Sequence, residues 1–313
     1  MAEIGSFGLD VGIYGSLATP ETILDLAHYA EAAGFESIWV ADHVAFPVTF
    51  KSEYPYSAKG DFPSRLADPL MEPVATMGVL VGATRRVKIG AAVLIVPYRN
   101  PVLLARMMVT LDQFSGGRMM FGAGTGWLEE EFDVLGAYEF KKRGRVTDEY
   151  IEIFKAISAG GEVGYQGQTY SFAPVVSNPG SVQRPHPPVL IGGLSVPALR
   201  RVARHGSGWL AVTAGSEQLE GSLVILKQLM AENGRRFGDL SLTYKMFIGI
   251  DQPKQSRFDT REPGTGTVAE IIDDLKRIFA LGFTRVIVRY RGQGADQQKR
   301  QLDRFVNEIV PKA

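Results

Sequence analysis

The sequence predicts a single (β/α)8 barrel domain over residues 1–313, and three observations support this fold class. Short apolar segments and amphipathic segments alternate eight times along the chain. The apolar segments run without polar interruption, which is typical of parallel strands that are buried on both faces. Eight strand–helix units in 313 residues also match the usual size of one barrel. An open, doubly wound sheet is the alternative topology.

The first two units are recognised from their turns and caps. Residues 7–13 form the first strand, and Thr19-Pro20 then supplies an N-cap and an N-terminal proline for a helix. Apolar residues recur at helical spacing until Gly34 ends this helix. Residues 36–40 form the second strand, which leads into Asp42-His43.

The remaining six units repeat this pattern, with apolar residues at spacings of three and four in each helix. Predicted strands cover residues 87–96, 118–124, 188–191, 208–212, 242–250 and 285–289. Predicted helices cover 69–83, 101–114, a segment from Glu129, a segment around 146–157, a segment from Ser195, 216–233, a segment around 268–278 and a last segment around 302–309.

Three long segments are inserted after the second, fourth and seventh strands. Residues 44–66 carry several aromatic side chains, namely Phe46, Phe50, Tyr54, Tyr56 and Phe62. Residues 159–187 are rich in glycine, proline, serine and glutamine and resemble an inserted excursion. Residues 251–265 are polar and are predicted to form a mobile loop. Because loops this long in compact domains are usually functional or mobile, the first and third are candidates for a substrate lid.

The composition is that of an ordinary globular protein and excludes several classes of site. Apolar residues make up 45% of the chain and charged residues 22%. Thirty-four basic residues balance thirty-four acidic ones, which argues against nucleic acid or an anionic membrane as a partner. The absence of cysteine excludes thiolate catalysis and thiolate metal sites. The sequence has no signal-peptide pattern at its start and no apolar run of membrane-spanning length, so a cytoplasmic location is expected.

Active sites of (β/α)8 barrels lie at the C-terminal ends of the strands, and this rule selects candidate residues. The strand ends carry Asp10, Asp42-His43, residues 92–97, 125–127 and 129–131, residues 192–195 and 213–215, Asp251, and residues 289–291. His43 is the best candidate for proton transfer, because a strand-end histidine can donate or accept a proton near neutral pH. A packing or capping role for His43 is the alternative.

Other chemistries fit the sequence less well. The four histidines show no metal-ligand spacing, so no metal site is expected. Lys245 lies within the seventh predicted strand, where an ion pair is favoured over Schiff-base chemistry. A glycosidase needs two carboxylates at strand ends, for which Glu130 and Asp251 are available. The glutamates at 129–131 are better explained as residues that complement a helix dipole.

Residues 188–201 have the pattern of an anion-binding site. The apolar strand ends at Gly192-Gly193, and Ser195 then occupies the N-cap position of a helix. Free backbone N–H groups and the positive end of the helix dipole favour a phosphate at such a turn. The pattern alone is equally compatible with glycines that only permit a sharp turn. Its place among other glycine-rich strand ends favours phosphate binding.

Seven short segments form a series along most of the chain. They are WVADH at 39–43, VLIVPYRNP at 93–101, LDQFSGGR at 111–118, GAGTGWLEEEF at 122–132, RGR at 143–145, PPVLIGG at 187–193 and GW at 208–209. Together and in this order they resemble the luciferase-like flavin and deazaflavin oxidoreductases, whose fold is a (β/α)8 barrel. Each segment alone is a weak signal, but the complete series is a strong one.

The resemblance implies a set of site residues. Asp42 and His43 would lie beside the reactive edge of a cofactor ring, with His43 as the proton-transfer residue. Ala92-Val93 would form a non-proline cis peptide that presses on one face of the ring. Further residues implied to bind the cofactor are Gly124, Thr125, Gly126, Gly192, Gly193, Leu194, Ser195 and Thr213. Residues expected to contact the substrate are Trp127, Tyr98 and Phe46, and Trp127 stands where the sugar-phosphate dehydrogenase branch has a glutamate.

The resemblance also implies a reaction. Members bind reduced FMN or coenzyme F420, and PYRNP at 97–101 with GTGW at 124–127 is most similar to the deazaflavin branch. Coenzyme F420 is therefore the first expectation, with hydride transfer to or from a small organic substrate. An FMNH2-dependent monooxygenase that uses oxygen and a separate flavin reductase is the alternative. A homodimer is expected from the family.

Overall fold

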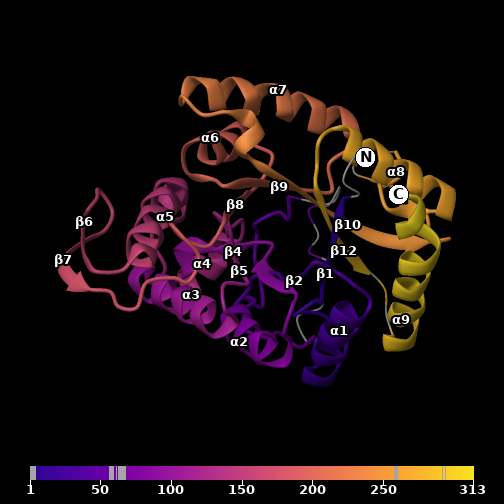
Figure 1. Ribbon diagram of the computed structural model, residues 1–313, viewed down its shortest axis with the longest axis horizontal. Coiled ribbons are helices and arrows are strands. Elements are labelled where there is room, and N and C mark those ends of the chain that lie inside the picture. Colours follow the sequence, from indigo (N-terminus) through magenta and orange to yellow (C-terminus); the bar gives the residue numbers. More distant parts are fainter. Residues whose placement is uncertain are drawn as a thin grey trace.

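The computed structural model describes residues 5–55, 60, 62, 68–256, 260–290, 292 and 294–313. Eight parallel strands close into a barrel in the order β1-β2-β3-β5-β8-β9-β10-β12, and β12 pairs with β1. Helices surround the strands, as Figure 1 shows. The predicted (β/α)8 barrel is confirmed.

The barrel strands lie close to their predicted positions. They are β1 (Ser6–Asp10), β2 (Ser37–Val40), β3 (Lys88–Ala91), β5 (Met119–Gly124), β8 (Val189–Gly192), β9 (Gly208–Val212), β10 (Ser241–Ile250) and β12 (Arg285–Tyr290). The α-helices are α1 (Pro20–Ala32), α2 (Pro73–Ala83), α3 (Pro101–Ser115), α4 (Glu129–Val134), α5 (Arg143–Ala159), α6 (Val196–His205), α7 (Ser216–Glu232), α8 (Val268–Ala280) and α9 (Ala295–Arg304).

Side-chain caps explain where several helices begin. Thr19 accepts a hydrogen bond from the Thr22 backbone N–H, and Ser195 accepts one from Ala198, as the sequence predicts. The predicted start of the second helix at residue 69 is wrong. Glu72 caps α2 through the Ala75 N–H, so the helix begins at Pro73. Residue 70 is extended instead, because it bridges to Tyr14.

The third barrel strand is shorter than predicted. Residues 87–96 are expected to form one strand, but β3 ends at Ala91 and a cis peptide follows between Ala92 and Val93. The short strand β4 (Leu94–Ile95) then pairs with β5, and a 3-10 turn covers Val96–Tyr98. The sequence of 87–96 does not indicate this break, because buried bulges and buried strands both consist of apolar residues.

Two of the apolar core clusters belong to the barrel and its surrounding helices. The larger one lies between the strands and the surrounding helices and includes Ile38, Phe121 and Val288. The smaller one consists of Trp39, Ala92, Met120, Leu190, Leu210 and Ile287. Because neighbouring residues of a strand face opposite sides, this second set fills the barrel interior. The barrel is therefore packed below its mouth.

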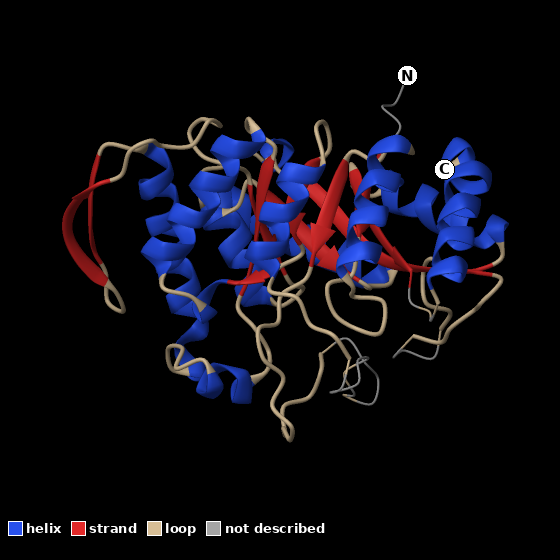
Figure 2. Ribbon diagram, turned by 90° about the horizontal axis from the view of Figure 1, so that it is seen from below, coloured by secondary structure: helices blue, strands red, loops and turns tan. Residues whose placement is uncertain are grey.

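The inserted segments differ in structure. Residues 159–187 contain an antiparallel hairpin of β6 (Glu162–Gln166) and β7 (Ser171–Val176), which projects away from the barrel in Figures 1 and 2. In the 251–265 segment, Arg261 pairs with Asp274 at 2.7 Å, and the short strand β11 (Thr265–Gly266) pairs with β10. Residues 260–265 are therefore tied to α8 and the barrel. Residues 257–259 lie outside the described part of the chain, as do Tyr56 and several neighbours in the 44–66 segment.

Long loops gather at one end of the barrel, on the lower side of Figure 2. These loops follow the C-terminal ends of the strands, which is the end where (β/α)8 barrels carry their sites. Within the described residues, no helix has the length and apolar character needed to cross a bilayer.

Candidate active site

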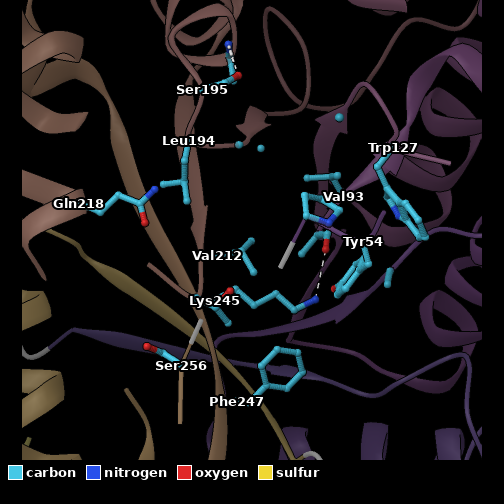
Figure 3. Close-up of a pocket in the computed structure, with 18 of the residues that line it drawn as sticks. Tyr54, Val93, Trp127, Leu194, Ser195, Val212, Gln218, Lys245, Phe247 and Ser256 are labelled. Carbon is cyan, nitrogen blue, oxygen red and sulfur yellow. Dashed lines mark hydrogen bonds between the residues drawn. The ribbon is translucent and has the colours of Figure 1, made fainter. Parts of the chain in front are cut away.

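A cavity of about 1290 Å³ opens at the C-terminal ends of the strands. Most residues that the sequence predicts for the site contribute to its wall. These are Asp42, His43, Ala92, Val93, Gly124, Thr125, Gly126, Trp127, Gly192, Gly193, Leu194, Ser195 and Thr213. Figure 3 shows Val93 and Trp127 on one side of the cavity, and Leu194 with Gln218 on another. The strand-end rule therefore predicts residues that share one cavity.

Val93 and two glycines form part of the cavity surface. The peptide between Ala92 and Val93 is cis, which confirms the expectation from the resemblance. The Val93 side chain lies directly over Gly124 of β5 and Gly192 of β8. A Cβ atom at either glycine would overlap the Val93 side chain. These two glycines therefore make room for Val93 at the barrel mouth.

His43 is held by a buried carboxylate from α4. Glu131 Oε2 lies 2.6 Å from His43 Nδ1 and accepts a 2.8 Å hydrogen bond from the Tyr98 hydroxyl. Glu131 Oε1 accepts hydrogen bonds from the backbone N–H groups of Val44 and Ala45, at 2.6 and 3.0 Å. Burial alone would raise the pKa of Glu131, but the bonds from His43, Val44 and Ala45 outweigh burial and lower it.

The ionised Glu131 determines which nitrogen of His43 carries the proton. A carboxylate only accepts hydrogen bonds, so a neutral His43 must carry its proton on Nδ1. This leaves Nε2 as the nitrogen for proton exchange, and His43 lines the cavity. His43 is 4% exposed, so its ring is fixed by contacts rather than by solvent.

Asp42 also lies in the wall, but its carboxylate is engaged. Its Oδ2 accepts hydrogen bonds from the Ile95 N–H and from Arg99, both at 2.7 Å, and its Oδ1 accepts a second bond from Arg99 at 3.0 Å. Arg99 also reaches Glu72 at 2.7 Å. Burial raises the pKa of Asp42, and the charge of Arg99 offsets this only in part. Asp42 thus connects the end of β2 to the segment after the cis peptide.

All three glutamates lie in the first turn of α4, as expected for residues that complement a helix dipole, and two of them also bind specific partners. Glu131 holds His43, as described above. Glu130 accepts hydrogen bonds from the Lys51 N–H at 2.6 Å and from the Ser52 hydroxyl at 2.7 Å. Both side chains therefore fix the loop after β2 against α4. Glu129 is exposed.

Two residues predicted to contact substrate do not lie in the cavity wall. Tyr98 is 7% exposed, donates its hydroxyl to Glu131 and packs against Phe132, with ring centroids 4.9 Å apart. Phe46 packs against the His43 ring at 4.5 Å between centroids. Tyr98 therefore contacts Glu131, and Phe46 contacts His43. Neither side chain forms part of the cavity wall. Trp127, the third predicted contact, does line the cavity.

An aromatic cluster surrounds Trp127. Phe62 stacks on it with ring centroids 5.7 Å apart, and Tyr54 and His43 meet it edge-on at 5.2 and 5.9 Å. Tyr54 and Phe62 come from the loop after β2 and also line the cavity. The 44–66 segment, one of the two candidate lids, therefore contributes aromatic side chains to the cavity wall.

Two helix N-termini border another part of the cavity. The Gly192–Ser195 turn precedes α6, and Gly193 has a φ of 119°, which favours glycine. Thr213 and Gly215 precede α7, and Thr213 has a φ of 46°, a conformation that β-branched residues rarely adopt. Such outliers concentrate at functional sites. Two sets of first-turn N–H groups therefore face a shared space, which suits an anionic group.

Lys245 enters the cavity wall from β10. Its ammonium lies 2.5 Å from Asp10 Oδ2 and donates a 3.2 Å hydrogen bond to the Ala92 carbonyl, marked by a dashed line in Figure 3. The ion pair expected for Lys245 is confirmed. Its partner Asp10 is fully buried.

From the sequence, Arg99 has no predicted role in the site, and Glu131 is a strand-end candidate whose bond to His43 is not predicted. Both lie inside segments of the family resemblance, at 122–132 and 93–101, and this position was the available signal. Their contacts with His43 and Asp42 span 88 and 57 positions in the chain. No local pattern encodes a contact over such a separation.

The glycosidase alternative loses its structural basis. Glu130 is occupied by Lys51 and Ser52, and Asp251 pairs with Arg304 at 2.8 Å. Neither carboxylate belongs to the described cavity wall. A pair of carboxylates on either side of a substrate, as glycoside hydrolysis requires, is therefore not formed by these two residues.

Comparisons with known proteins agree with this geometry. The chain is 29% identical over 297 residues to an uncharacterized protein of Mycobacterium tuberculosis, which covers 92% of this chain and 94% of that protein. It is 30% identical over 250 residues to the FMNH2-dependent dimethylsulfone monooxygenase of Pseudomonas putida, which covers 79% of this chain and 61% of that protein. An F420-dependent secondary alcohol dehydrogenase, solved with an F420–acetone adduct, has the same fold, with a TM-score of 0.80 at 17% identity and 98% coverage of both chains.

A match to a protein family also covers nearly the whole chain. The model for the luciferase-like monooxygenase family matches residues 6–304, from the first barrel strand to the last α-helix. The closed barrel, the cis peptide after the third strand and the strand-end cavity all lie within this range. The chain therefore belongs to the luciferase-like monooxygenase family.

Proposed function

We propose that this protein is an oxidoreductase that binds coenzyme F420 in the barrel cavity and moves hydride between the deazaflavin and a small organic substrate. One observation carries the proposal. A single cavity combines a flat surface made by Val93 over two glycines, a histidine with a fixed tautomer, and two helix N-termini. These features suit a flat ring, a proton transfer and a phosphate, in that order.

The residues present fit such a cofactor. Gly124 and Gly192 leave space that a Cβ atom would fill, and Val93 occupies it with an apolar surface suited to the face of a ring. Residues 192–195 together with Thr213 are suited to the phosphate, because first-turn N–H groups bind anions. A cavity of about 1290 Å³ exceeds the usual range for small ligands and can hold a cofactor and a substrate together.

The protein and the cofactor divide the work of the reaction. A bound deazaflavin supplies hydride chemistry, which no side chain of this protein can supply. His43 gives or takes the accompanying proton at Nε2, because Glu131 holds Nδ1. Trp127, Tyr54 and Phe62 form an apolar wall that excludes water and favours an apolar substrate.

The experiment is a turnover assay with F420 and with reduced F420 against a panel of small alcohols, ketones and enones. Absorbance of the oxidised deazaflavin reports hydride transfer directly. Turnover with at least one member of the panel, lost in the His43→Ala variant, supports the proposal. Binding of F420 without turnover across the panel in both directions would instead indicate a cofactor-binding barrel without this activity.

An FMNH2-dependent monooxygenase is the second candidate, favoured by the 30% identity to the dimethylsulfone monooxygenase. This reaction would require reduced FMN from a separate flavin reductase, and molecular oxygen as co-substrate. The test supplies reduced FMN with and without oxygen and follows oxidation of an organic sulfone or a comparable substrate. Product that depends on both reduced FMN and oxygen would replace the F420 proposal with this one.

A further inference from the structure

Lys245 is a buried cation whose position the proposed reaction does not explain. Its side chain is 6% exposed and extends into the cavity from β10, toward the Ala92 carbonyl (Figure 3). Long basic side chains rarely remain buried unless they are paired or serve a site. Lys245 is paired with Asp10, and Asp10 also faces a second cation, Arg289.

The cluster around Lys245 contains more positive than negative charge. Asp10 of β1 faces Lys245 at 2.5 Å and Arg289 of β12 at 3.8 Å. Arg289 also donates to the Tyr14 carbonyl, and its guanidinium lies 4.5 Å from the centre of the Tyr14 ring. One carboxylate therefore faces two cations, and these three residues, the basic cluster, carry a net charge of +1.

The two cations of the basic cluster stabilise the ionised form of Asp10. Its single negative charge cancels only one of the two positive charges. Burial alone would raise the pKa of Asp10, but Lys245 and Arg289 outweigh burial and lower it. Asp10 is therefore ionised at neutral pH, and the +1 excess remains. Other buried carboxylates of the cavity wall belong to separate ion pairs, since Asp42 pairs with Arg99 and Asp274 pairs with Arg261.

We propose that Lys245, as the member of the basic cluster that lines the cavity, makes the protein bind the reduced cofactor more tightly than the oxidised cofactor. This inference rests on the proposed function, and its charge argument is made for the flavin ring, whose oxidised form is neutral. When a neutral oxidised ring accepts a hydride, two electrons and one proton enter the ring, and the product carries one negative charge. A fixed cation near the ring favours that product over the neutral oxidised form.

The proposal gives Lys245 a redox role that is distinct from holding the chain in place. A hydrogen bond to the Ala92 carbonyl needs only a neutral donor, which a glutamine can supply. The preference for a reduced ligand needs the charge. Lys245 is also not placed as a nucleophile, because its Nζ atom is engaged in the ion pair with Asp10.

The experiment measures the dissociation constants of oxidised and reduced FMN under anaerobic conditions at pH 8, followed by the same measurement with F420 and reduced F420. The ratio of the oxidised to the reduced constant reports the preference, and by linkage it fixes the shift in potential on binding. For FMN, whose oxidised ring is neutral, wild-type protein is expected to give a ratio of at least tenfold, which corresponds to about 30 mV for a two-electron couple. The F420 arm shows whether the preference extends to the deazaflavin.

Three variants separate charge from structure. Lys245→Gln is expected to lower the FMN ratio at least tenfold, whereas Lys245→Arg keeps the charge and is expected to keep most of the ratio. Lys155→Gln is the matched control, because Lys155 of α5 also donates to a backbone carbonyl, that of His205, and lies outside the cavity wall. It is expected to leave the ratio unchanged. Circular dichroism confirms that each variant is folded.

Each outcome decides a different question. A wild-type FMN ratio near one overturns the inference even if Lys245→Gln does not fold. An unchanged ratio in folded Lys245→Gln also overturns it, while the proposed function stands as long as cofactor binds. If wild-type protein binds neither FMN nor F420 in either redox state, the proposed function fails, and this inference fails with it.

Discussion

Glu131 joins three parts of the chain through one buried carboxylate. It contacts His43 after β2, the backbone of the following loop, and Tyr98 after the cis peptide. From the sequence, a run of three glutamates at a helix start is sufficiently explained by the helix dipole. That explanation depends on local spacing, whereas the actual role depends on a partner 88 positions away. Residue identity at the strand ends could therefore be predicted, but not the hydrogen-bond network behind them.

Replacing Glu131 tests this account at the scale of one residue. Glu131→Gln is expected to lower the free energy of unfolding by about 3 kcal/mol, because an amide oxygen cannot accept the four hydrogen bonds that the carboxylate accepts. Glu129→Gln is the matched control, because exposed Glu129 lies in the same helical turn. A dipole effect alone predicts equal, small losses of 0.3–1 kcal/mol for both. Urea unfolding of the two variants distinguishes these explanations.

His43 is expected to act in turnover rather than in cofactor binding. His43→Ala should keep the cofactor dissociation constant within about threefold of the wild-type value and reduce turnover at least a hundredfold, the usual size of a general acid–base contribution. His28→Gln, outside the cavity wall, serves as the control. Steady-state kinetics give kcat, and a fluorescence titration gives the binding constant. Unchanged kcat in His43→Ala would remove His43 from the reaction.

At the scale of elements, the third barrel strand shows that an apolar pattern predicts burial but not the end of a strand. An apolar run from 87 to 96 predicts burial correctly, yet the strand breaks after Ala91 and resumes as β4. The structure also gives a reason for two glycines on neighbouring strands, since Gly124 and Gly192 accommodate Val93. Glycine in a strand indicates a close approach in general, but not which residue approaches.

The contact between Val93 and Gly124 can be tested by a double-mutant cycle. Gly124→Ala is expected to cost about 1–3 kcal/mol of stability, because its Cβ would overlap the Val93 side chain. In a Val93→Ala background, the same change should cost much less. Gly221→Ala is the control, since a Cβ there meets no atom within 4 Å in helix α7, and it should stabilise the protein by up to about 1 kcal/mol. Additive effects in the cycle would contradict the packing explanation.

At the scale of the whole molecule, the alternation of strands and helices was sufficient to predict the closed barrel. Hydrophobic periodicity and caps such as Thr19 and Ser195 are local signals, and the structure confirms the elements that rest on them. The β6–β7 hairpin and the ties of the 251–265 segment to α8 could not be predicted, because they depend on partners distant in the chain.

The stability of the folded barrel is expected to depend on pH, because the carboxylate of Glu36 titrates. This carboxylate lies 2.9 Å from Arg285 of β12 and 2.7 Å from Lys88 of β3. Burial alone would raise the pKa of Glu36, but Arg285 and Lys88 lower it from 4.5 to about 2. A lowered pKa stabilises the folded state above pH 4.5, and this stabilisation is lost as the pH falls from 4.5 to 2.

The difference in unfolding free energy between wild type and Glu36→Gln should therefore be roughly 3 kcal/mol at pH 6 and close to zero at pH 2. Denaturant unfolding at several pH values measures this difference. A difference that does not change with pH would show that folding does not lower the pKa of Glu36.

Several exposed apolar side chains on neighbouring helices bear on assembly. Leu103 and Phe114 of α3 are 53% and 80% exposed, and Val79 of α2 is 55% exposed. We expect this surface to be covered in a homodimer, since contiguous apolar surface on a monomer often marks an interface. Light scattering after gel filtration should give twice the chain mass of 34.2 kDa, and a Leu103→Glu, Phe114→Glu variant should give that mass once. A monomeric wild-type protein would contradict the expectation.

The most direct test of the central claim is a titration of the purified protein with coenzyme F420 and, separately, with FMN, each in oxidised and reduced form and followed by absorbance and fluorescence. The strand-end cavity, with Val93 over its glycines and the α6 N-terminus at its border, predicts a dissociation constant in the micromolar range or below for at least one of them. Absence of binding by both cofactors at micromolar concentrations, in either redox state, would contradict the claim.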